Sequence, residues 1–250
     1  MKPIVVFVLA VTCAIVGEVH AQPRMIGGMD TNIKDYPFMV HFTYFGDPVG
    51  NGVVLSDKWI LSGAIVVLGT PASAYLVLLG SSDYRNGPQK FQVERNFPHP
   101  EYVGYDNNIG LSKLARPIKF SNVVRPIQIA TDSPDYIRLT MVSFGRNDRG
   151  TTHLQKAEFD MSVDPVCIGK LKEYEAKQVV EVGHGYCVTS PGGRGGHYFT
   201  DIGAPVVSGS SKLYALFSFS EGPGGITEVS VATRILPYKE WIDKTMSRFP

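Results

Sequence analysis

The chain has 250 residues, of which 44% are hydrophobic and 19% charged, and its 24 basic side chains almost balance 23 acidic ones. This composition excludes an intrinsically disordered chain, which would combine low hydrophobicity with a high net charge. It also argues against a protein that binds nucleic acid, because such proteins carry a clustered excess of Lys and Arg.

The first 21 residues have the pattern of a secretory signal peptide. Lys2 precedes an apolar run over residues 4–17, and the segment 19–21 places small residues where a signal peptidase cleaves. The alternative is an N-terminal membrane anchor, but the run is shorter than the roughly 20 residues that a membrane span needs. We therefore expect a secreted, extracellular protein with a signal peptide over residues 1–21 and no membrane partner.

Short apolar segments separated by turn signals predict a β-rich domain. Their separators are clusters of Gly, Pro, Asn and Asp, and many short strands of this kind indicate a β-sandwich or a β-barrel. The strand-like segments are residues 52–56, 59–61 and 75–79 and the alternating pairs Phe91/Val93, Ile127/Ile129, Leu139/Met141 and Val229/Val231.

Helical periodicity is firm only near the end of the sequence. There, four apolar side chains would share one face of a helix over about residues 238–247, and Pro237 stands at its start. These four are Tyr238, Trp241, Ile242 and Met246. A second, weaker helix is predicted around residues 173–180.

Two cysteines remain once the signal peptide, which contains Cys13, is removed. In an oxidising compartment this even number favours a disulfide between Cys167 and Cys187. Loop-closure entropy alone assigns such a bridge about 3 kcal/mol. The sequence has no Cys or His cluster at metal-ligand spacing, and we expect neither a metal nor another cofactor.

Five segments in a fixed order carry a family resemblance. They are Arg24-Met25-Ile26-Gly27-Gly28, residues 50–64, His99-Pro100 together with residues 106–114, residues 200–207 and residues 238–242. In this order they resemble five segments of trypsin- and chymotrypsin-like serine proteases. The first three are the activation site, the segment that runs into the catalytic histidine and the segment of the catalytic aspartate. The last two are the Gly-Asp-Ser-Gly-Gly-Pro nucleophile turn and the closing helix.

This resemblance implies an all-β fold of two orthogonal six-stranded antiparallel β-barrels with a C-terminal α-helix. A short propeptide would cover residues 22–24 and the protease-like domain residues 25–250. The first barrel would span about residues 25–125 and the second about residues 126–237. The bridge between Cys167 and Cys187 matches the family's disulfide in the second barrel, whereas the bridge beside the catalytic histidine would fall on Gly50 and Val66 and is absent.

The resemblance also places an unsuitable residue at each position of the catalytic triad. Ile65 stands for the histidine and has no lone pair with which to move a proton. Asn108 stands for the aspartate that orients this histidine, and Ile202 for the nucleophilic serine. Thr200 replaces a glycine of the oxyanion hole. We therefore expect no proteolysis; the alternative, a triad assembled around another histidine, has no matching motif.

The specificity pocket is altered in the same way. Gly196 falls at its base, where an aspartate would select Arg or Lys, and Ser220 and Ser230 replace wall glycines. The segment Ser218-Phe219-Ser220 resembles the family's Ser-Trp-Gly edge strand, beside which the substrate lies. Tyr198 or Phe199 would be positioned to plug the cavity, or else would be ordinary aromatic side chains. We expect that no arginine-type side chain is bound in the family's usual way.

The activation machinery is a separate expectation. In active relatives, cleavage after the basic residue frees an α-ammonium that pairs with the buried aspartate before the nucleophile. The corresponding pair here would be Met25 and Asp201, after cleavage at Arg24. Alternatively, residues 22–24 stay attached and Asp201 has another donor.

A secreted scaffold without catalysis is expected to bind other proteins. Loss of all three triad residues resembles the inactivated protease paralogues of parasitic mites, relatives of the group 3 mite allergens that are associated with interference with host complement. The resemblance thus implies a partner in host defence, such as a complement component. One alternative is a non-catalytic cofactor in an arthropod proteolytic cascade, and another is a residual serine endopeptidase. The oligomeric state is left open.

Overall fold

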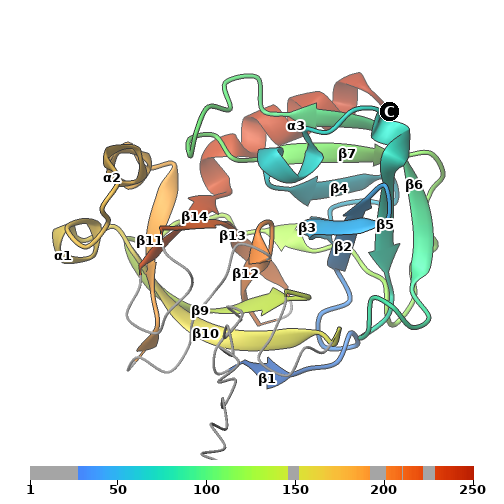
Figure 1. The fold of residues 1–250 in the computed structure, drawn as a ribbon, viewed down its shortest axis with the longest axis horizontal. Helices are drawn as coiled ribbons and strands as arrows, with labels where there is room; N and C mark the ends of the chain where they lie inside the picture. Colours follow the sequence, from blue (N-terminus) through green and yellow to red (C-terminus); the bar gives the residue numbers. More distant parts are fainter. Residues whose placement is uncertain (1–27, 146–151, 192–200, 210, 222–228) are drawn as a thin grey trace, which may run out of the picture.

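The computed structural model describes residues 28–145, 152–191, 201–209, 211–221 and 229–250. Most of the regular elements are short strands, and helices are in a minority (Figure 1). In the first half the elements are β1 (Met29–Asp30), β2 (Met39–Tyr44), β3 (Asp47–Val54), β4 (Trp59–Ser62), η1 (Ala64–Val67), η2 (Ala72–Ala74), β5 (Tyr75–Leu79), β6 (Gln89–Pro98) and β7 (Gly110–Leu114). In the second half they are β8 (Gln128–Ile129), β9 (Tyr136–Ser143), β10 (Gln155–Ser162), α1 (Pro165–Ile168), α2 (Tyr174–Glu181), β11 (Gly185–Thr189), β12 (Pro205–Ser208), β13 (Lys212–Ser220), β14 (Ser230–Arg234), η5 (Leu236–Tyr238) and α3 (Lys239–Arg248).

The first barrel closes in the order β2-β3-β4-β7-β6-β5, and each of its pairings is antiparallel. Side-chain alternation explains which face of each strand points inward, since successive residues of a strand point to opposite faces. In β6, for example, Phe91 and Val93 are buried and their neighbours Gln92 and Glu94 are exposed.

The second barrel is also a closed ring of six antiparallel strands. Its order is β9-β10-β11-β14-β13-β12, and β12 pairs back onto β9. Two further short strands extend it, β8 beside β13 and β1 beside β10. β1 precedes the first barrel in the chain yet joins the sheet of the second. The two-barrel fold expected from the sequence is thereby confirmed.

Each barrel has its own apolar core, and a further apolar cluster lies between the two barrels. A single cluster of buried side chains joins Leu61 and Leu111 of the first barrel to Val142 and Leu216 of the second and to Ile242 of α3. α3 lies along the first barrel beside β7 and β4 (Figure 1). The predicted C-terminal helix and the weaker helix near residues 173–180, now α2, are both confirmed.

The disulfide between Cys167 and Cys187 is formed. It ties the short helix α1, which the sequence analysis did not predict, to β11. Asp164 caps α1 by accepting a hydrogen bond from the Cys167 N–H at 2.9 Å, as expected for an N-cap aspartate. In the part of the chain that the structure describes, no helix is long and apolar enough to cross a membrane.

His41 of β2 lies buried where the barrels meet. Its ring stacks on Tyr84 with centroids 4.2 Å apart and meets Phe144 of the second barrel edge-on at 5.8 Å. Among the described protein atoms neither ring nitrogen has a hydrogen-bond partner of good geometry. Burial lowers the pKa of His41 to about 4, and the nearby Asn51 side chain offsets this only in part.

We therefore predict that the protein loses stability as the pH falls from about 6.5 towards 4. In this window the unfolded chain binds a proton at this histidine and the folded chain does not, which removes about 3 kcal/mol of unfolding free energy by pH 4. Urea unfolding across this range measures the slope. His41→Phe keeps a ring between Tyr84 and Phe144 and should flatten the slope by that amount; parallel curves for the two proteins would contradict the assignment.

Candidate functional site

The three expected triad positions lie around Gly63, the residue before η1. The Ile65 N–H donates a hydrogen bond of 3.1 Å to Asn108 Oδ1. A methyl group placed on Gly63 would lie 3.1 Å from Asn108 Oδ1 and 3.5 Å from Ile202 Cγ2. The structure thus brings together Ile65, Asn108 and Ile202, which come from three separate segments of the chain.

Asn108 is the buried centre of this arrangement, with 4% of its surface exposed. Its Nδ2 donates to Ser218 Oγ on β13 at 2.8 Å, while its Oδ1 accepts from Ile65. Its backbone carbonyl accepts from Thr233 Oγ1 on β14 at 3.3 Å. A neutral amide can donate and accept at once, so Asn108 holds the first barrel against two strands of the second.

Ile65 is the exposed member of the set. Its neighbours in η1, Ala64, Val66 and Val67, are buried, whereas Ile65 is 48% exposed. An aliphatic side chain on the surface offers contact area but neither a proton donor nor an acceptor.

Ile202 lies on a turn that is fixed by backbone hydrogen bonds to both barrels. The Asn51 N–H of β3 donates to Ile202 O at 2.8 Å, and the Gly203 N–H donates to Phe217 O at 2.8 Å. Gly203 has φ +78°, and a Cβ there would lie 2.1 Å from Asn51 O. The turn therefore requires glycine at this position, both because φ is positive and because a Cβ would clash with the Asn51 carbonyl. The side chain of Ile202 packs on the core of the first barrel.

Gly50 and Val66 stand where the family has the disulfide beside the catalytic histidine, and they lie in contact. A Cβ on Gly50 would be 2.7 Å from Val66 Cγ2 and 2.9 Å from Ile202 O. Val66 is 3% exposed and belongs to the first-barrel core. A packed valine therefore occupies the space beside Gly50.

Asp201, the expected partner of the activation ammonium, is fully buried. Its Oδ1 accepts a hydrogen bond from Ser143 Oγ at 2.6 Å, and the Gly145 N–H donates to the same hydroxyl at 2.8 Å. A Cβ on Gly145 would lie 1.9 Å from Asp201 Oδ1, so glycine makes room for the carboxylate. Met25 lies outside the described residues, and its pairing with Asp201 stays a prediction.

Two of the expected pocket positions face each other across β13 and β14, where Ser220 pairs with Ser230. Ser230 is fully buried. The Ser220 hydroxyl is also buried and has no hydrogen-bond partner among the described atoms. The remaining expected positions, Gly196 at the pocket base and Thr200 at the oxyanion hole, lie outside the described residues, as do Tyr198 and Phe199.

The structure adds one contact that the sequence analysis missed. Tyr105, in the loop before Asn108, stacks on Phe219 of β13 with ring centroids 4.0 Å apart and planes 22° from parallel. Phe219 lies between Ser218 and Ser220 in the segment that resembles the family's substrate-binding edge strand. The Tyr105 ring therefore covers this strand from the first barrel. No periodicity in the loop indicates where Tyr105 points.

The described side chains form no alternative triad. His99 Nδ1 accepts from a backbone N–H of Glu101, and His184 Nδ1 pairs with Asp106 at 2.7 Å. Among the described residues no histidine nitrogen hydrogen-bonds to a hydroxyl or a thiol, and none of their His, Cys, Asp and Glu side chains form a group of three suited to a metal ion. The family's triad uses a histidine to activate the serine, and within these residues no hydroxyl or thiol is bonded to a histidine.

Comparison with known proteins identifies the surrounding scaffold. A family model described as Trypsin matches residues 25–242. A phenoloxidase-activating enzyme of Bombyx mori is 27% identical over 92% of this chain, and trypsin epsilon of Drosophila erecta is 23% identical over 98% of both chains. Complement C1s subcomponent of Rattus norvegicus is 33% identical over 46% of this chain and 18% of its own length. The match to the Bombyx mori enzyme spans 62% of that protein, which is less than two thirds of its length.

We predict that Asn108 and Ser218 act as one energetic unit. Asn108→Ala and Ser218→Ala should each lower the unfolding free energy by about 1–3 kcal/mol, because each leaves a buried polar partner unsatisfied. The double variant should lose at least about 0.5 kcal/mol less than the sum, as measured by denaturant unfolding.

As a matched control, Ser218→Ala is combined with Ser162→Ala, whose hydroxyl bonds to Asp164 instead. These two substitutions share no partner and should be additive within about 0.5 kcal/mol. Additivity of the Asn108 and Ser218 pair as well would argue against a shared interaction.

Proposed function

The chain belongs to the trypsin family of serine proteases, and from this premise we propose that it is a proteolytically inactive member that acts by binding another protein. The observation that carries the proposal is the cluster at Gly63, where Ile65, Asn108 and Ile202 meet on a family scaffold. These side chains comprise two aliphatic groups and one neutral amide.

The proposed inactivity follows from what each group can do during peptide hydrolysis. Ile202 has no atom that attacks a carbonyl, and Ile65 has none that takes up or returns a proton. Loss of either function alone removes about 10⁶ in turnover in a comparable protease, and losses within one triad do not add. The hydroxyl nearest to Asn108, that of Ser218, accepts the amide hydrogen bond and is 2% exposed.

The altered site also supports a binding role. Ile65 and Leu68, the residue after η1, are each 48% exposed, so two aliphatic side chains lie at the surface close to the former triad. Exposed apolar surface in a folded protein often marks a place where another protein binds. We propose that a partner covers this surface, and that the Tyr105 ring on Phe219 prevents a peptide from pairing with the edge strand as a substrate would.

The finer assignment concerns the partner. We propose a secreted protein of host defence, such as a complement component, in keeping with the resemblance to inactivated mite proteases that are related to allergens. Family membership is consistent with secretion. The similarity to a phenoloxidase-activating enzyme of Bombyx mori favours a second candidate, in which the chain is a non-catalytic cofactor of an arthropod cascade.

The proposal of inactivity predicts that the purified chain neither digests casein nor reacts with a fluorophosphonate probe. The covalent reaction requires an activated nucleophile, which the wild-type site lacks. The matched variant Ile65→His/Asn108→Asp/Ile202→Ser restores the three groups on the same scaffold and should gain labelling. Casein digestion by the wild-type chain that a serine-directed covalent inhibitor abolishes would refute the proposal.

The binding role predicts that Ile65→Glu reduces recovery of a partner at least about tenfold, because the partner would have to desolvate a new charge. The measurement is a pull-down from host serum and, separately, from arthropod haemolymph, with recovered proteins identified by mass spectrometry. Val166→Glu, on α1, is the control because Val166 is 72% exposed and lies in a different element. Recovery of a partner from serum supports the host-defence role, and recovery from haemolymph supports the role as a cofactor of an arthropod cascade. An equal loss of recovery for the Ile65 and Val166 variants would contradict the proposed surface.

A further inference from the structure

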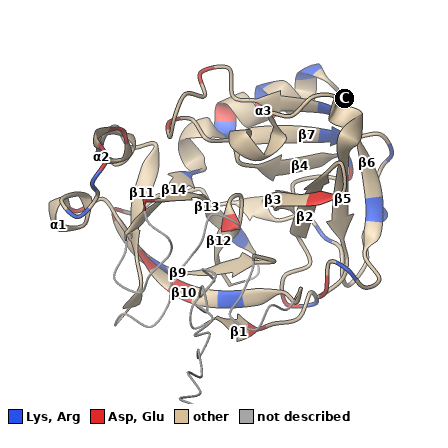
Figure 2. Cartoon of the chain, in the orientation of Figure 1, with Lys and Arg blue, Asp and Glu red and all other residues tan. Residues whose placement is uncertain are grey.

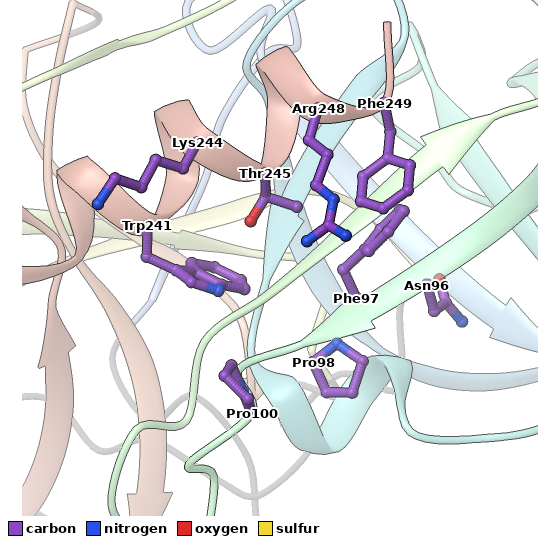
Figure 3. A pocket seen from close by; sticks show the side chains of 9 residues that line it. All are labelled: Asn96, Phe97, Pro98, Pro100, Trp241, Lys244, Thr245, Arg248 and Phe249. Atoms are coloured by element: carbon purple, nitrogen blue, oxygen red, sulfur yellow. The ribbon is translucent and has the colours of Figure 1, made fainter.

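A hollow of about 450 Å³ lies between α3 and β6, and it shares no residue with the site around Asn108. We call it the α3 groove. Its apolar walls are rings, of which Phe97, Pro98 and Pro100 come from the first barrel and Trp241 and Phe249 from α3 and the residue after it. Figure 3 shows these rings together with Lys244, Thr245 and Arg248, which line the side formed by α3.

The rings of the α3 groove are held in place by one another. Phe97 and Phe249 lie 4.7 Å apart between centroids, and Phe97 also meets the buried Trp59 at 5.4 Å. Trp241 packs against His99 at 4.9 Å. The Lys113 ammonium donates to the carbonyl oxygen of Pro250 at 2.7 Å, which fixes the chain beyond Phe249. The groove therefore exists before a ligand arrives, which lowers the entropy lost on binding.

Two arginines stack on these rings. The guanidinium carbon of Arg95 lies 4.8 Å from the centroids of both Phe97 and Phe249, and that of Arg248 lies 5.5 Å from Phe249. In Figure 3 the Arg248 side chain points from α3 toward Phe97 and β6. Stacking fixes the plane of a guanidinium and leaves its N–H groups directed outward, where they can bind a carboxylate in two places.

The charge of these arginines is not neutralised within the described structure. Figure 2 shows Lys and Arg on α3 and on the neighbouring strands β6 and β7. The lysines have acidic partners: Lys113 with Glu94, Lys239 with Asp243 and Lys244 with Glu240. Arg95 and Arg248 pair with no carboxylate of the described residues.

We propose that the α3 groove binds an acidic peptide segment of a partner protein, in which carboxylates alternate with aromatic side chains. The aromatic side chains would pack against Trp241, and the carboxylates would meet Arg248, which lines the groove, and Arg95, which does not line it but contacts the rings of Phe97 and Phe249. The volume is in the range of preformed pockets that take a few side chains. Only two arginines are unpaired and α3 also carries Glu240 and Asp243, so the groove fits one or two carboxylates better than a densely charged sulfated glycan.

The test is fluorescence anisotropy with a fluorescein-labelled peptide of sequence Asp-Phe-Glu-Asp-Tyr-Glu. It should bind with a dissociation constant in the micromolar range, and the binding should weaken with added salt. Asn-Phe-Gln-Asn-Tyr-Gln removes the charges and Asp-Ala-Glu-Asp-Ala-Glu removes the rings, and each should bind at least about tenfold more weakly. A heparin hexasaccharide is the fourth probe.

Variants of the chain localise the binding. Arg248→Gln and Arg95→Gln should each weaken binding of the first peptide by about tenfold, with unchanged circular dichroism. Arg116→Gln is the matched control, since Arg116 stacks on Phe91 at 4.4 Å outside the groove, and it should change binding less than about twofold.

The chain has two tryptophans, of which Trp59 is buried, so peptide binding should also change the emission of Trp241. No binding up to millimolar peptide, equal binding of the uncharged peptide, or equal losses in the Arg116 variant would overturn the proposal. Binding of the heparin fragment without binding of the peptide would overturn it in favour of a polyanion site.

Discussion

The arrangement of the site around Gly63 depends on one buried residue, Asn51 of β3, which joins the two barrels. Its N–H donates to Ile202 O at 2.8 Å, and its side-chain oxygen accepts the Phe144 N–H at 3.1 Å. Its own carbonyl accepts from Ser62 Oγ at 2.6 Å. Buried backbone groups are costly to leave unpaired, so these bonds fix where the turn at Ile202 lies relative to η1. Because Ile202 lies on that turn, the position of the turn also determines which side chains surround Gly63.

The site therefore has two parts with different roles. One is a framework of backbone contacts and buried polar groups that holds the barrels together, and the other is the set of side chains that this framework positions. The framework is intact: Gly203 keeps its positive φ against Asn51, and Asp201 remains buried beside Ser143 and Gly145. The framework serves the packing of the barrels whether or not a peptide is cut. The side chains of Ile65 and Ile202 make no polar contact within this framework, so the turn does not depend on a polar group at either position.

How far the sequence could predict the structure depends on whether a feature is local. The alternation of Phe91 and Val93 and the spacing of Trp241 and Ile242 predict β6 and α3, because periodicity determines which face is buried. The family motifs likewise predict that Ile65, Asn108 and Ile202 converge, and the structure brings them together. In contrast, α1 has only four residues and a cap, which is too short to show a period.

Long-range contacts between side chains were beyond such reasoning. Ser218 and Asn108 are separated by 110 residues, and nothing in either segment indicates that this hydroxyl accepts the amide hydrogen bond. The stack of Tyr105 on Phe219 likewise depends on the path of an irregular loop. Only two of the three pocket positions named from the motifs, Ser220 and Ser230, can be located, as a pair across β13 and β14.

Net charge also conceals where charge is available for binding. The sequence is nearly neutral, which argues against a surface that binds a phosphate backbone. Neutrality of the whole, however, does not show which charges are paired. Lys239 pairs with Asp243, whereas other cations have aromatic rings as their neighbours. Arg95 and Arg248 are of this second kind, because aromatic faces attract a guanidinium without cancelling its charge. On the two proposals made above, a scaffold without triad chemistry carries a preformed place for an anion elsewhere on its surface.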